Sequence, residues 1–327
     1  MKNDEVKQAR TITRRETFQR GLTLSAGLAL GAGIRPTAAQ STPVVTPVAA
    51  TDFARPQALI DAPTLMTLEG DPARTMLALM PADEFAAGHI AGSVQVDWPA
   101  MEITDTSDAS VAHWREAMTR LLTGLGASTV RAVVSCDGGS LFATRPWWVL
   151  HYLGHTTVHV LNGGLPAWRA AGGEAETGAV ATPTASPTAT PIANPLAPAT
   201  LRPEALAPLD EIRTNLDDPN VVLVDARTPE EYAEGHIPGA VNVNYPRNAQ
   251  PDPPRFWRPQ DELRAIYAEV GVTPDKRVIP YCTTGVRSSV TFFSLHLIGY
   301  DNVGLYTGSW AEWSSHPDLP ITTGNAP

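Results

Sequence analysis

The sequence predicts an α/β protein made of two tandem copies of one fold, each a mainly parallel sheet flanked by helices. Short apolar runs of strand length alternate with helical patterns, which is the order of parallel βαβ units. The sequence of residues 84–94 recurs with variations at residues 231–241, and this indicates an internal duplication. A stretch rich in Pro, Ala and Thr at residues 176–200 separates the copies, because such proline density excludes a packed helix or central strand.

Length and composition agree with a globular protein of two domains. The chain has 327 residues, 43% of them hydrophobic, and a formal net charge of −10. This length corresponds to about two domains plus extra segments. The acidic balance argues against nucleic acid as a partner, since such binding needs a basic surface. Two cysteines are too few for a disulfide framework, and no Cys/His cluster has the spacing of a metal site.

Residues 1–39 have the pattern of a twin-arginine-type signal peptide. Arg14 and Arg15 precede an apolar, glycine-rich stretch at residues 21–34, and small residues follow just before Gln40. The apolar stretch is too short for an ordinary membrane span. We therefore expect export to a periplasmic or other extracytoplasmic location, with no stable membrane span in the mature protein. The alternative is a disordered basic N-terminus.

The first copy is predicted at residues 55–175, after a flexible tether at residues 40–54 that is rich in Pro, Thr, Val and Ala. Apolar runs predict its strands, and Gly and Pro mark the ends of its helices. The predicted strands cover 75–80, 131–135 and 157–161. One helix is predicted to start at 81, and three others cover 112–122, 146–153 and 165–171.

The second copy is predicted at residues 201–327, with strands and helices in the same order. Its predicted strands cover 221–225, 277–281 and 303–306, and its predicted helices cover 229–233, 261–270, 288–298 and 310–313.

Cys282 is the residue that we interpret as catalytic. It follows the predicted strand 277–281 and precedes the predicted helix 288–298, where backbone N–H groups and the helix dipole stabilise an anion. We therefore predict that Cys282 is a nucleophile that carries a sulfur atom. The predicted substrate-binding loop comprises Thr283, Thr284, Gly285, Val286, Arg287 and Ser288.

A comparison of the two copies supports this reading over that of a buried structural cysteine. When the copies are aligned on Trp168 and Trp313, Asp137 falls opposite Cys282. Only the second copy has a nucleophile at the key position, so we predict that the first copy is inactive.

The length of the loop separates two chemistries that use a cysteine before a helix. A phosphatase needs five residues between the cysteine and an arginine that grips two phosphate oxygens. Here Arg287 comes one position too early and Ser288 occupies the place of that arginine. The smaller loop favours a single transferred sulfur over a phosphate.

Three groups of residues together resemble the rhodanese family of sulfurtransferases. They are Asp225-Ala226-Arg227, the stretch 235–240 and the loop 282–288. The tandem arrangement resembles that of the two-domain thiosulfate and 3-mercaptopyruvate sulfurtransferases, and Asp137 is similar to the aspartate of their inactive first domain. The resemblance implies that Cys282 takes sulfane sulfur from a donor, holds it as a persulfide and passes it to a thiophilic acceptor such as cyanide or a thiol. It implies no cofactor.

The sequence departs from that pattern where family members bind the donor. Glu231 stands where two-domain members often carry an arginine, and Thr284 stands at a basic position of the thiosulfate type. Arg287 could supply the missing charge from the other end of the loop, so thiosulfate is the expected donor. The alternatives are 3-mercaptopyruvate as donor, or a non-catalytic exported module that binds sulfur species. The oligomeric state is left open.

Other polar residues have structural interpretations. Arg227 is included among the substrate-binding residues, although we favour an ion pair with the supporting residue Asp225 that braces the site. His89 and His236 occupy equivalent places in the two copies, so both are expected to be structural. A metal site is not expected at His151, His155 and His159, because Gly154 interrupts the helix between them. Cys136 is expected to be a free, buried thiol.

Overall fold

The computed structural model describes residues 52–128, 132–178 and 200–327, all within one compact unit. The predicted signal peptide, most of the tether and most of the linker lie outside these ranges. In the described part of the chain, no helix is both long and apolar enough to cross a membrane.

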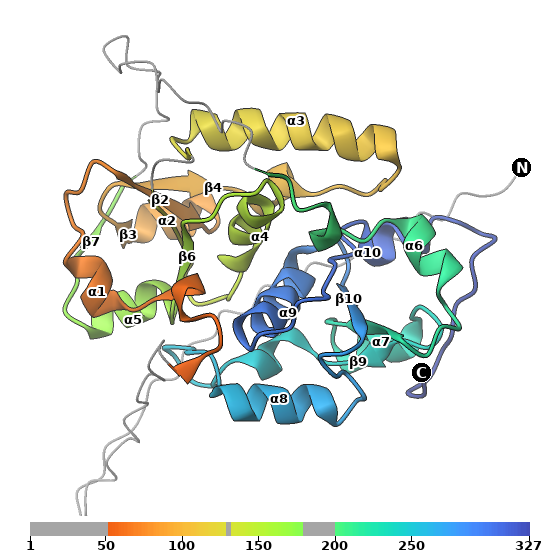
Figure 1. Ribbon diagram of the computed structural model, residues 1–327. Helices are drawn as coiled ribbons and strands as arrows, with labels where there is room; N and C mark the ends of the chain where they lie inside the picture. Colours follow the sequence, from red (N-terminus) through yellow and green to blue (C-terminus); the bar gives the residue numbers. More distant parts are fainter. Residues whose placement is uncertain (1–51, 129–131, 179–199) are drawn as a thin grey trace, which may run out of the picture. The chain divides into compact units, whose positions relative to one another are not determined.

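The N-terminal copy is built on a five-stranded sheet with the order β1-β6-β5-β2-β4 (Figure 1). Each neighbouring pair of strands is parallel, which confirms the predicted sheet type. The strands are β1 (Leu59–Ile60), β2 (Arg74–Leu79), β4 (Ser93–Val96), β5 (Ala132–Cys136) and β6 (Val158–Leu161).

Helices pack on both faces of this sheet because successive strand side chains point to opposite sides. From β2, Met76 and Ala78 belong to one apolar cluster, while Leu77 and Leu79 belong to another. The first cluster includes residues of α1 (Ala62–Met66), α2 (Ala82–Ala87) and α5 (Gly164–Ala170), and the second includes residues of α3 (Asp108–Gly124) and α4 (Thr144–Tyr152). A small antiparallel pair, β3 (His89–Ile90) and β7 (Ala175–Glu176), lies beside them.

The C-terminal copy repeats this architecture. Its sheet contains β8 (Val221–Asp225), β9 (Val241–Asn242) and β10 (Arg277–Tyr281) in the parallel order β10-β8-β9. Two parallel bridges, Val278 to Val303 and Leu206 to Leu305, extend the same order beyond β10. The helices are α6 (Leu209–Thr214), α7 (Pro229–Glu234), α8 (Gln260–Ala268), α9 (Val286–Leu297) and α10 (Ser309–Trp313).

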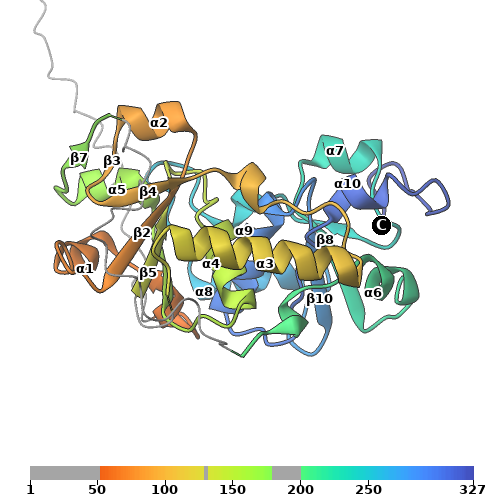
Figure 2. The same ribbon diagram turned by 90° about the horizontal axis from the view of Figure 1, so that it is seen from above.

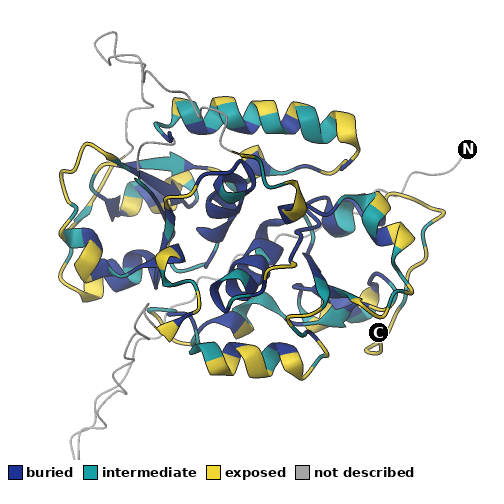
Figure 3. Ribbon diagram, viewed as in Figure 1, coloured by how far each residue is buried: buried dark blue, intermediate teal, exposed yellow. Residues whose placement is uncertain are grey.

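The two copies share one apolar core, in which α4 and α9 lie side by side (Figures 1 and 2). Trp147 of α4 meets Phe293 of α9 edge to face, with ring centroids 4.7 Å apart. Thr144 and Ser289, which are equivalent positions of the two copies, are joined by a 2.8 Å hydrogen bond between their hydroxyls. Both helices are almost wholly buried, whereas α3 and α8 expose one side (Figure 3).

Several predicted elements differ from the structure. Helix α3 begins four residues before the predicted 112, and α4 begins two residues before the predicted 146. Helix α9 begins at Val286, two residues before the prediction, because Gly285 with φ +90° ends the preceding loop directly before it. The predicted strand 303–306 forms only the isolated bridges at Val303 and Leu305. The short strands β1, β3, β4, β7 and β9 were not predicted, since two to four residues are too few to show a period.

Candidate active site

Cys282 lies at the carboxyl edge of the C-terminal sheet. It directly follows β10, and the last residue of β10, Tyr281, pairs with Asp225 at the end of β8. Ligands of α/β proteins bind at this edge of the sheet. The fold therefore brings Asp225 and Cys282, which are far apart in sequence, to neighbouring strand ends.

The loop from Cys282 to Gly285 is four residues long and directs an N–H group at the sulfur. The backbone N–H of Gly285 donates to Sγ of Cys282 at 3.2 Å. Only glycine suits this place, because its φ is +90° and an added Cβ would lie 2.9 Å from the carbonyl oxygen of Thr307. Cys282 is 1% exposed in this state. The loop is therefore shaped to stabilise a negative charge on the sulfur.

Helix α10 holds the loop from the other side. The N–H of Cys282 donates to Oγ of Ser309 at 3.2 Å. The N–H groups of Trp310 and Ala311 donate to the carbonyl oxygens of Cys282 and Thr283, each at 3.0 Å. These bonds fix the backbone of the loop without using the thiol.

Asp137 occupies the equivalent place in the N-terminal copy. Its carboxyl oxygens accept N–H groups from Gly139 at 2.7 Å and from Ala143 at 2.9 Å. Burial raises the pKa of Asp137, while these hydrogen bonds act in the opposite direction. In the second copy, a backbone N–H therefore donates to the sulfur of Cys282. In the first copy, backbone N–H groups donate to the carboxylate of Asp137, which has no nucleophilic sulfur.

Arg287 lies on the first turn of α9, and Glu231 engages its charge. Glu231 accepts hydrogen bonds from Nη1 and Nη2 of Arg287 at 2.6 and 2.8 Å, and Nη2 also donates to Oγ1 of Thr283. The hydrogen bond from Arg287 lowers the pKa of Glu231 to about 2. The sequence suggested that Arg287 replaces a missing cation, but in this structure its charge is compensated by Glu231.

Arg227 and Asp225 form the predicted ion pair, and both are buried. Nη2 of Arg227 is 2.6 Å from Oδ2 of Asp225 and donates to the carbonyl oxygen of Gly235 at 2.7 Å. The guanidinium carbon lies 4.6 Å from the ring centroid of Trp310. Arg227 therefore connects the end of β8 to α10, which holds the Cys282 loop.

The remaining loop residues have separate surroundings. Val286 and Ser288 are buried on the first turn of α9, and Oγ of Ser288 has no hydrogen-bond partner among the described residues. Oγ1 of Thr284 donates to Oε1 of Glu102 at 2.6 Å.

Besides Ser309 of α10, two residues of the N-terminal copy contact the loop and were not predicted from the sequence. Glu102 accepts from Thr284, and Arg145 of α4 donates from Nη1 to the carbonyl oxygen of Gly285 at 3.5 Å. The only signal in the sequence is that Arg145 is a charged residue directly before the apolar run Pro146-Trp147-Trp148. Their proximity to Cys282 depends on how the two copies pack.

The histidines examined in the sequence are held by other groups. The Nδ1 atoms of His89 and His236 contact the carbonyl oxygens of Phe85 and Tyr232 at 2.9 and 2.8 Å. Each ring also stacks on the aromatic ring of that same residue. Both contacts are the same in the two copies, which agrees with a structural role.

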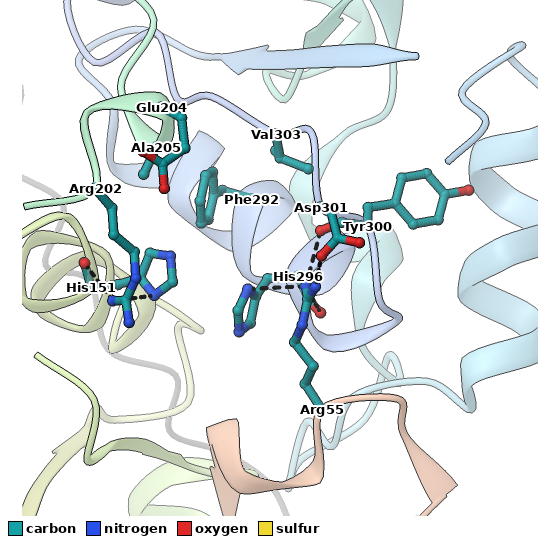
Figure 4. A pocket seen from close by; sticks show the side chains of 10 residues that line it. All are labelled: Arg55, His151, Arg202, Glu204, Ala205, Phe292, His296, Tyr300, Asp301 and Val303. Carbon is teal, nitrogen blue, oxygen red and sulfur yellow. Dashed lines mark hydrogen bonds and ion pairs between the residues drawn. The ribbon is translucent and has the colours of Figure 1, made fainter. Parts of the chain in front are cut away.

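His151 borders a cavity of about 260 Å³ where α4 and α9 end (Figure 4). Arg202 donates to Nδ1 of His151 at 3.3 Å, and Arg55 donates to Nδ1 of His296 at 3.2 Å. His155 and His159 instead contact carbonyl oxygens of Ser128 and Gln57. The three histidines at 151, 155 and 159 thus face different partners. Within the described ranges, no three His, Cys, Asp or Glu residues are placed to hold a metal.

Cys136 is a free thiol in the core of the N-terminal copy. Burial raises the pKa of this thiol to about 12. Because the thiolate is the reactive form of cysteine, Cys136 is unsuited to nucleophilic chemistry in the folded protein.

The fold and this site define a rhodanese-type protein, and comparison with known families agrees. The model of the Rhodanese-like domain matches residues 64–171 and 208–316. The chain therefore belongs to the rhodanese family and contains two such domains in tandem, as the resemblance implied. The matched ranges fall inside the two predicted copies.

Individual relatives cover most of the chain. It is 34% identical to a thiosulfate sulfurtransferase of Pseudomonas aeruginosa over 77% of this chain and 92% of the relative. It is 32% identical to a thiosulfate sulfurtransferase of Azotobacter vinelandii over 83% and 98%. A third relative, the mitochondrial thiosulfate/3-mercaptopyruvate sulfurtransferase 1 of Arabidopsis thaliana, is 29% identical over 74% and 69%.

Solved structures with a similar fold include a sulfur-handling enzyme. A structure of EanB with ergothioneine covalently linked to a persulfide has a TM-score of 0.70 and 26% identity, over 83% of this chain and 71% of that chain. The anaerobic ergothioneine biosynthesis enzyme of Chlorobium limicola, in complex with trimethyl histidine, has a TM-score of 0.67 and 25% identity over the same shares.

Proposed function

We propose that the protein is a thiosulfate sulfurtransferase in which Cys282 is the nucleophile. The observation that carries this proposal is the loop around the sulfur, where the N–H of Gly285 donates to Sγ at 3.2 Å. In the other copy the equivalent position is Asp137. The names of the relatives from Pseudomonas aeruginosa and Azotobacter vinelandii support thiosulfate as the donor.

The reaction divides into two displacements at sulfur. The Cys282 thiolate attacks the outer sulfur of thiosulfate, a new S–S bond forms, and the old S–S bond breaks so that sulfite leaves with the electron pair. A thiophilic acceptor such as cyanide then attacks the outer sulfur of the persulfide. The acceptor leaves as thiocyanate, and the Cys282 thiolate is regenerated. Neither step needs a proton donor on the leaving group or an added cofactor, because sulfite and thiolate are both stable anions.

Each site residue has a role in this proposal. The amides of the loop and the dipole of α9 stabilise the thiolate and the persulfide anion. Arg287 and the hydroxyl groups border the place where the donor binds, and the Asp225–Arg227 pair supports the strand end. The residues proposed to contact the substrate are Thr283, Thr284, Gly285, Val286, Arg287, Ser288 and Arg227.

Intact-mass measurement after incubation with thiosulfate tests the proposal. We expect wild-type protein to gain the mass of one sulfur atom and to lose it on treatment with cyanide. Cys282→Ser should gain none, while the matched variant Cys136→Ser should behave like wild type, since Cys136 is a buried thiol outside the loop. A sulfur adduct in Cys282→Ser, or none in the wild type, would refute the assignment.

The same assay with 3-mercaptopyruvate addresses the second candidate donor. The name of the Arabidopsis relative includes both donors, and this favours testing both side by side. If 3-mercaptopyruvate forms the persulfide much faster than thiosulfate does, 3-mercaptopyruvate replaces thiosulfate as the proposed donor. The proposed role of Cys282 is unchanged by that result.

We further propose that the protein is exported through its twin-arginine-type N-terminus. The support is the pattern of Arg14, Arg15 and the apolar stretch 21–34. Expression of the full chain in a bacterium with a twin-arginine pathway should yield mature protein that begins near Gln40. Retention of Met1 in the cytoplasm, unchanged by replacing both arginines with lysine, would contradict export.

A further inference from the structure

Arg145 is a fully buried cation that reaches the Cys282 loop from the N-terminal copy. Its side chain is 0% exposed. Nη1 donates to the carbonyl oxygen of Gly285 at 3.5 Å, and Nη2 donates to Oγ1 of Thr307 at 3.0 Å and to the carbonyl oxygen of Met101. Gly285 is the residue whose N–H donates to Sγ of Cys282. One residue therefore connects the guanidinium with the catalytic sulfur.

The charge of Arg145 has no carboxylate partner among the described residues, since none forms an ion pair with it within 4 Å. Its Nε is also without a hydrogen-bond partner there. Burying an unpaired charge costs several kcal/mol in a folded protein. The guanidinium carbon lies 4.9 Å from the ring centroid of Trp148, but an aromatic ring supplies no net negative charge, so an anion near Arg145 would stabilise it further.

Cys282 and Glu102 are the two ionisable groups whose negative charge would act on Arg145. Burial lowers the pKa of Arg145 to about 10, and charge on Cys282 and on Glu102 acts in the opposite direction. Glu102 already accepts a hydrogen bond from Thr284 at 2.6 Å. Cys282 is thus the buried group whose negative charge Arg145 can balance.

The other charged groups around the loop already have ion-pair or hydrogen-bond partners. Arg287 of α9 is held by Glu231 of α7, and Arg227 is held by Asp225 of β8. From α10, Glu312 accepts hydrogen bonds from Thr106. Among the described residues around the loop, Arg145 is the cation without a carboxylate partner, and it belongs to the copy that has Asp137 in place of a nucleophile.

We propose that Arg145 is the counter-cation of the Cys282 thiolate and persulfide, so that the N-terminal copy supplies an electrostatic part of the active site. This inference rests on the proposed function of Cys282. Arg145 is a positioning residue, because it also fixes the Gly285–Val286 peptide by binding its carbonyl oxygen. It provides a physical reason for a sulfurtransferase to keep a copy without a nucleophile.

The rate at which iodoacetamide alkylates Cys282 tests the proposal, because only the thiolate reacts. The measurement uses the Cys136→Ser background, so that intact mass reports Cys282 alone, at a series of pH values from 5 to 9. We expect Arg145→Gln to slow alkylation at pH 7 by about tenfold or more and to displace the pH profile toward higher pH, as loss of a nearby opposite charge requires. Arg145→Lys retains a cationic group but not the three hydrogen bonds of the guanidinium, so it should slow alkylation less than Arg145→Gln does.

Two controls separate charge from packing. Thr144→Val removes the hydrogen bond to Ser289 one residue before Arg145 and changes no charge, so its alkylation profile should match the wild type. The double variant Glu231→Gln/Arg287→Gln removes one charge of each sign, so it should slow alkylation less than Arg145→Gln does. The proposal fails if Arg145→Gln reacts like the wild type, or if Thr144→Val slows the reaction as much.

Glu102→Gln keeps the proposal testable if Arg145→Gln does not fold. Glu102 is a half-buried residue beside Thr284, and its removal leaves Arg145 with Cys282 as its remaining anionic neighbour. Alkylation of Cys282 should then become several-fold faster, and an equal or slower rate would overturn the inference. Alkylation needs no sulfur donor, so failure to form a persulfide with thiosulfate would refute the proposed function without affecting this result.

Discussion

Glu231 is the residue whose position alters the predicted donor site most, because it pairs with Arg287. Its carboxylate takes both Nη atoms of Arg287 at 2.6 and 2.8 Å, so the cation that could bind thiosulfate is occupied. Thiosulfate is a compact dianion, and its binding has to compete with this intramolecular pair. If Arg287 binds the donor as we propose, Glu231 and the donor compete for it.

Glu231→Gln should strengthen the binding of thiosulfate. The change frees Arg287 from its counter-charge, and a partly exposed ion pair is worth about 1 kcal/mol or less. We expect the KM for thiosulfate to fall up to about fivefold, which is the factor that corresponds to that energy. Steady-state kinetics checks this, with Glu230→Gln as the matched control because Glu230 is the neighbouring acid of α7. An increase in KM for Glu231→Gln alone would contradict this view.

The same pair predicts how stability depends on pH. Arg287 lowers the pKa of Glu231 from its ordinary 4.5 to about 2, so the folded state holds the carboxylate more strongly than the unfolded state does. The stabilisation is present above about pH 4.5 and is lost as pH falls toward about 2. Glu231→Gln should therefore have a lower Tm than wild type at pH 7 and an equal Tm near pH 2. Thermal unfolding followed over this range measures the difference, and a constant difference would contradict the pairing.

At the scale of elements, the site is a strand, a four-residue loop and a helix. Gly285 ends the loop with φ +90°, and α9 begins at Val286. This arrangement brings one N–H to the sulfur and places Arg287 and Ser288 on the helix. In the N-terminal copy, Asp137 lies between the equivalent strand β5 and helix α4, but its loop is longer and the donors to its carboxylate are Gly139 and Ala143.

Gly285→Ala should disrupt this element. A left-handed backbone costs a residue with a side chain about 1 to 2 kcal/mol, and the new Cβ would also lie 2.9 Å from the oxygens of Thr307. We expect a lower Tm together with a large loss of persulfide formation. Gly271→Ala is the matched control, since Gly271 has φ +76° with nothing within 4 Å of an added Cβ. It should lower Tm but leave persulfide formation unchanged, and equal activity of the two variants would contradict this role of Gly285.

At the scale of the whole molecule, the packing of α4 on α9 joins the two copies. The C-terminal ends of both helices carry histidines, His151 and His296, with ring centroids 5.0 Å apart (Figure 4). Arg202 donates to the carbonyl oxygen of His151 and Arg55 to that of His296, at 2.8 and 2.9 Å. The segment that leads into each copy thus binds the end of the buried helix of the other.

This junction should make the protein sensitive to mild acid. Burial, followed by the nearby arginines, lowers the pKa of His151 to about 3, and burial likewise lowers the pKa of His296 well below 6.5. Below pH 6.5 the unfolded chain binds protons that the folded chain does not, so stability falls as pH drops. Each histidine adds a slope of about 1.4 kcal/mol per pH unit.

The double variant His151→Asn/His296→Asn tests this account. Because it lacks both titrating groups, its free energy of unfolding should depend less steeply on pH between about 6 and 4 than that of the wild type. Urea unfolding at several pH values measures the slopes. Equal slopes in the two proteins would show that these histidines do not titrate on unfolding.

Much of the fold could be predicted from local patterns in the sequence. Strand β8 and strand β10 were predicted at their observed bounds. Apolar runs of five residues that contain several β-branched residues are too short for a typical helix and indicate buried strands. The duplication and the position of Cys282 between a strand and a helix were also predicted from the sequence. These features depend on residues that are close together in the chain.

The electrostatic environment of Cys282 was decided by tertiary structure alone. Thr284 meets Glu102 across 182 positions of sequence, and Gly285 meets Arg145 across 140. The sequence predicted that Arg287 is free to bind the donor, whereas in the fold it pairs with Glu231. Charge acts through space and not along the chain. The sequence by itself therefore determined that Cys282 stands between a strand and a helix, whereas only the packing of the two copies decided that Arg145 and Glu102 lie beside its loop.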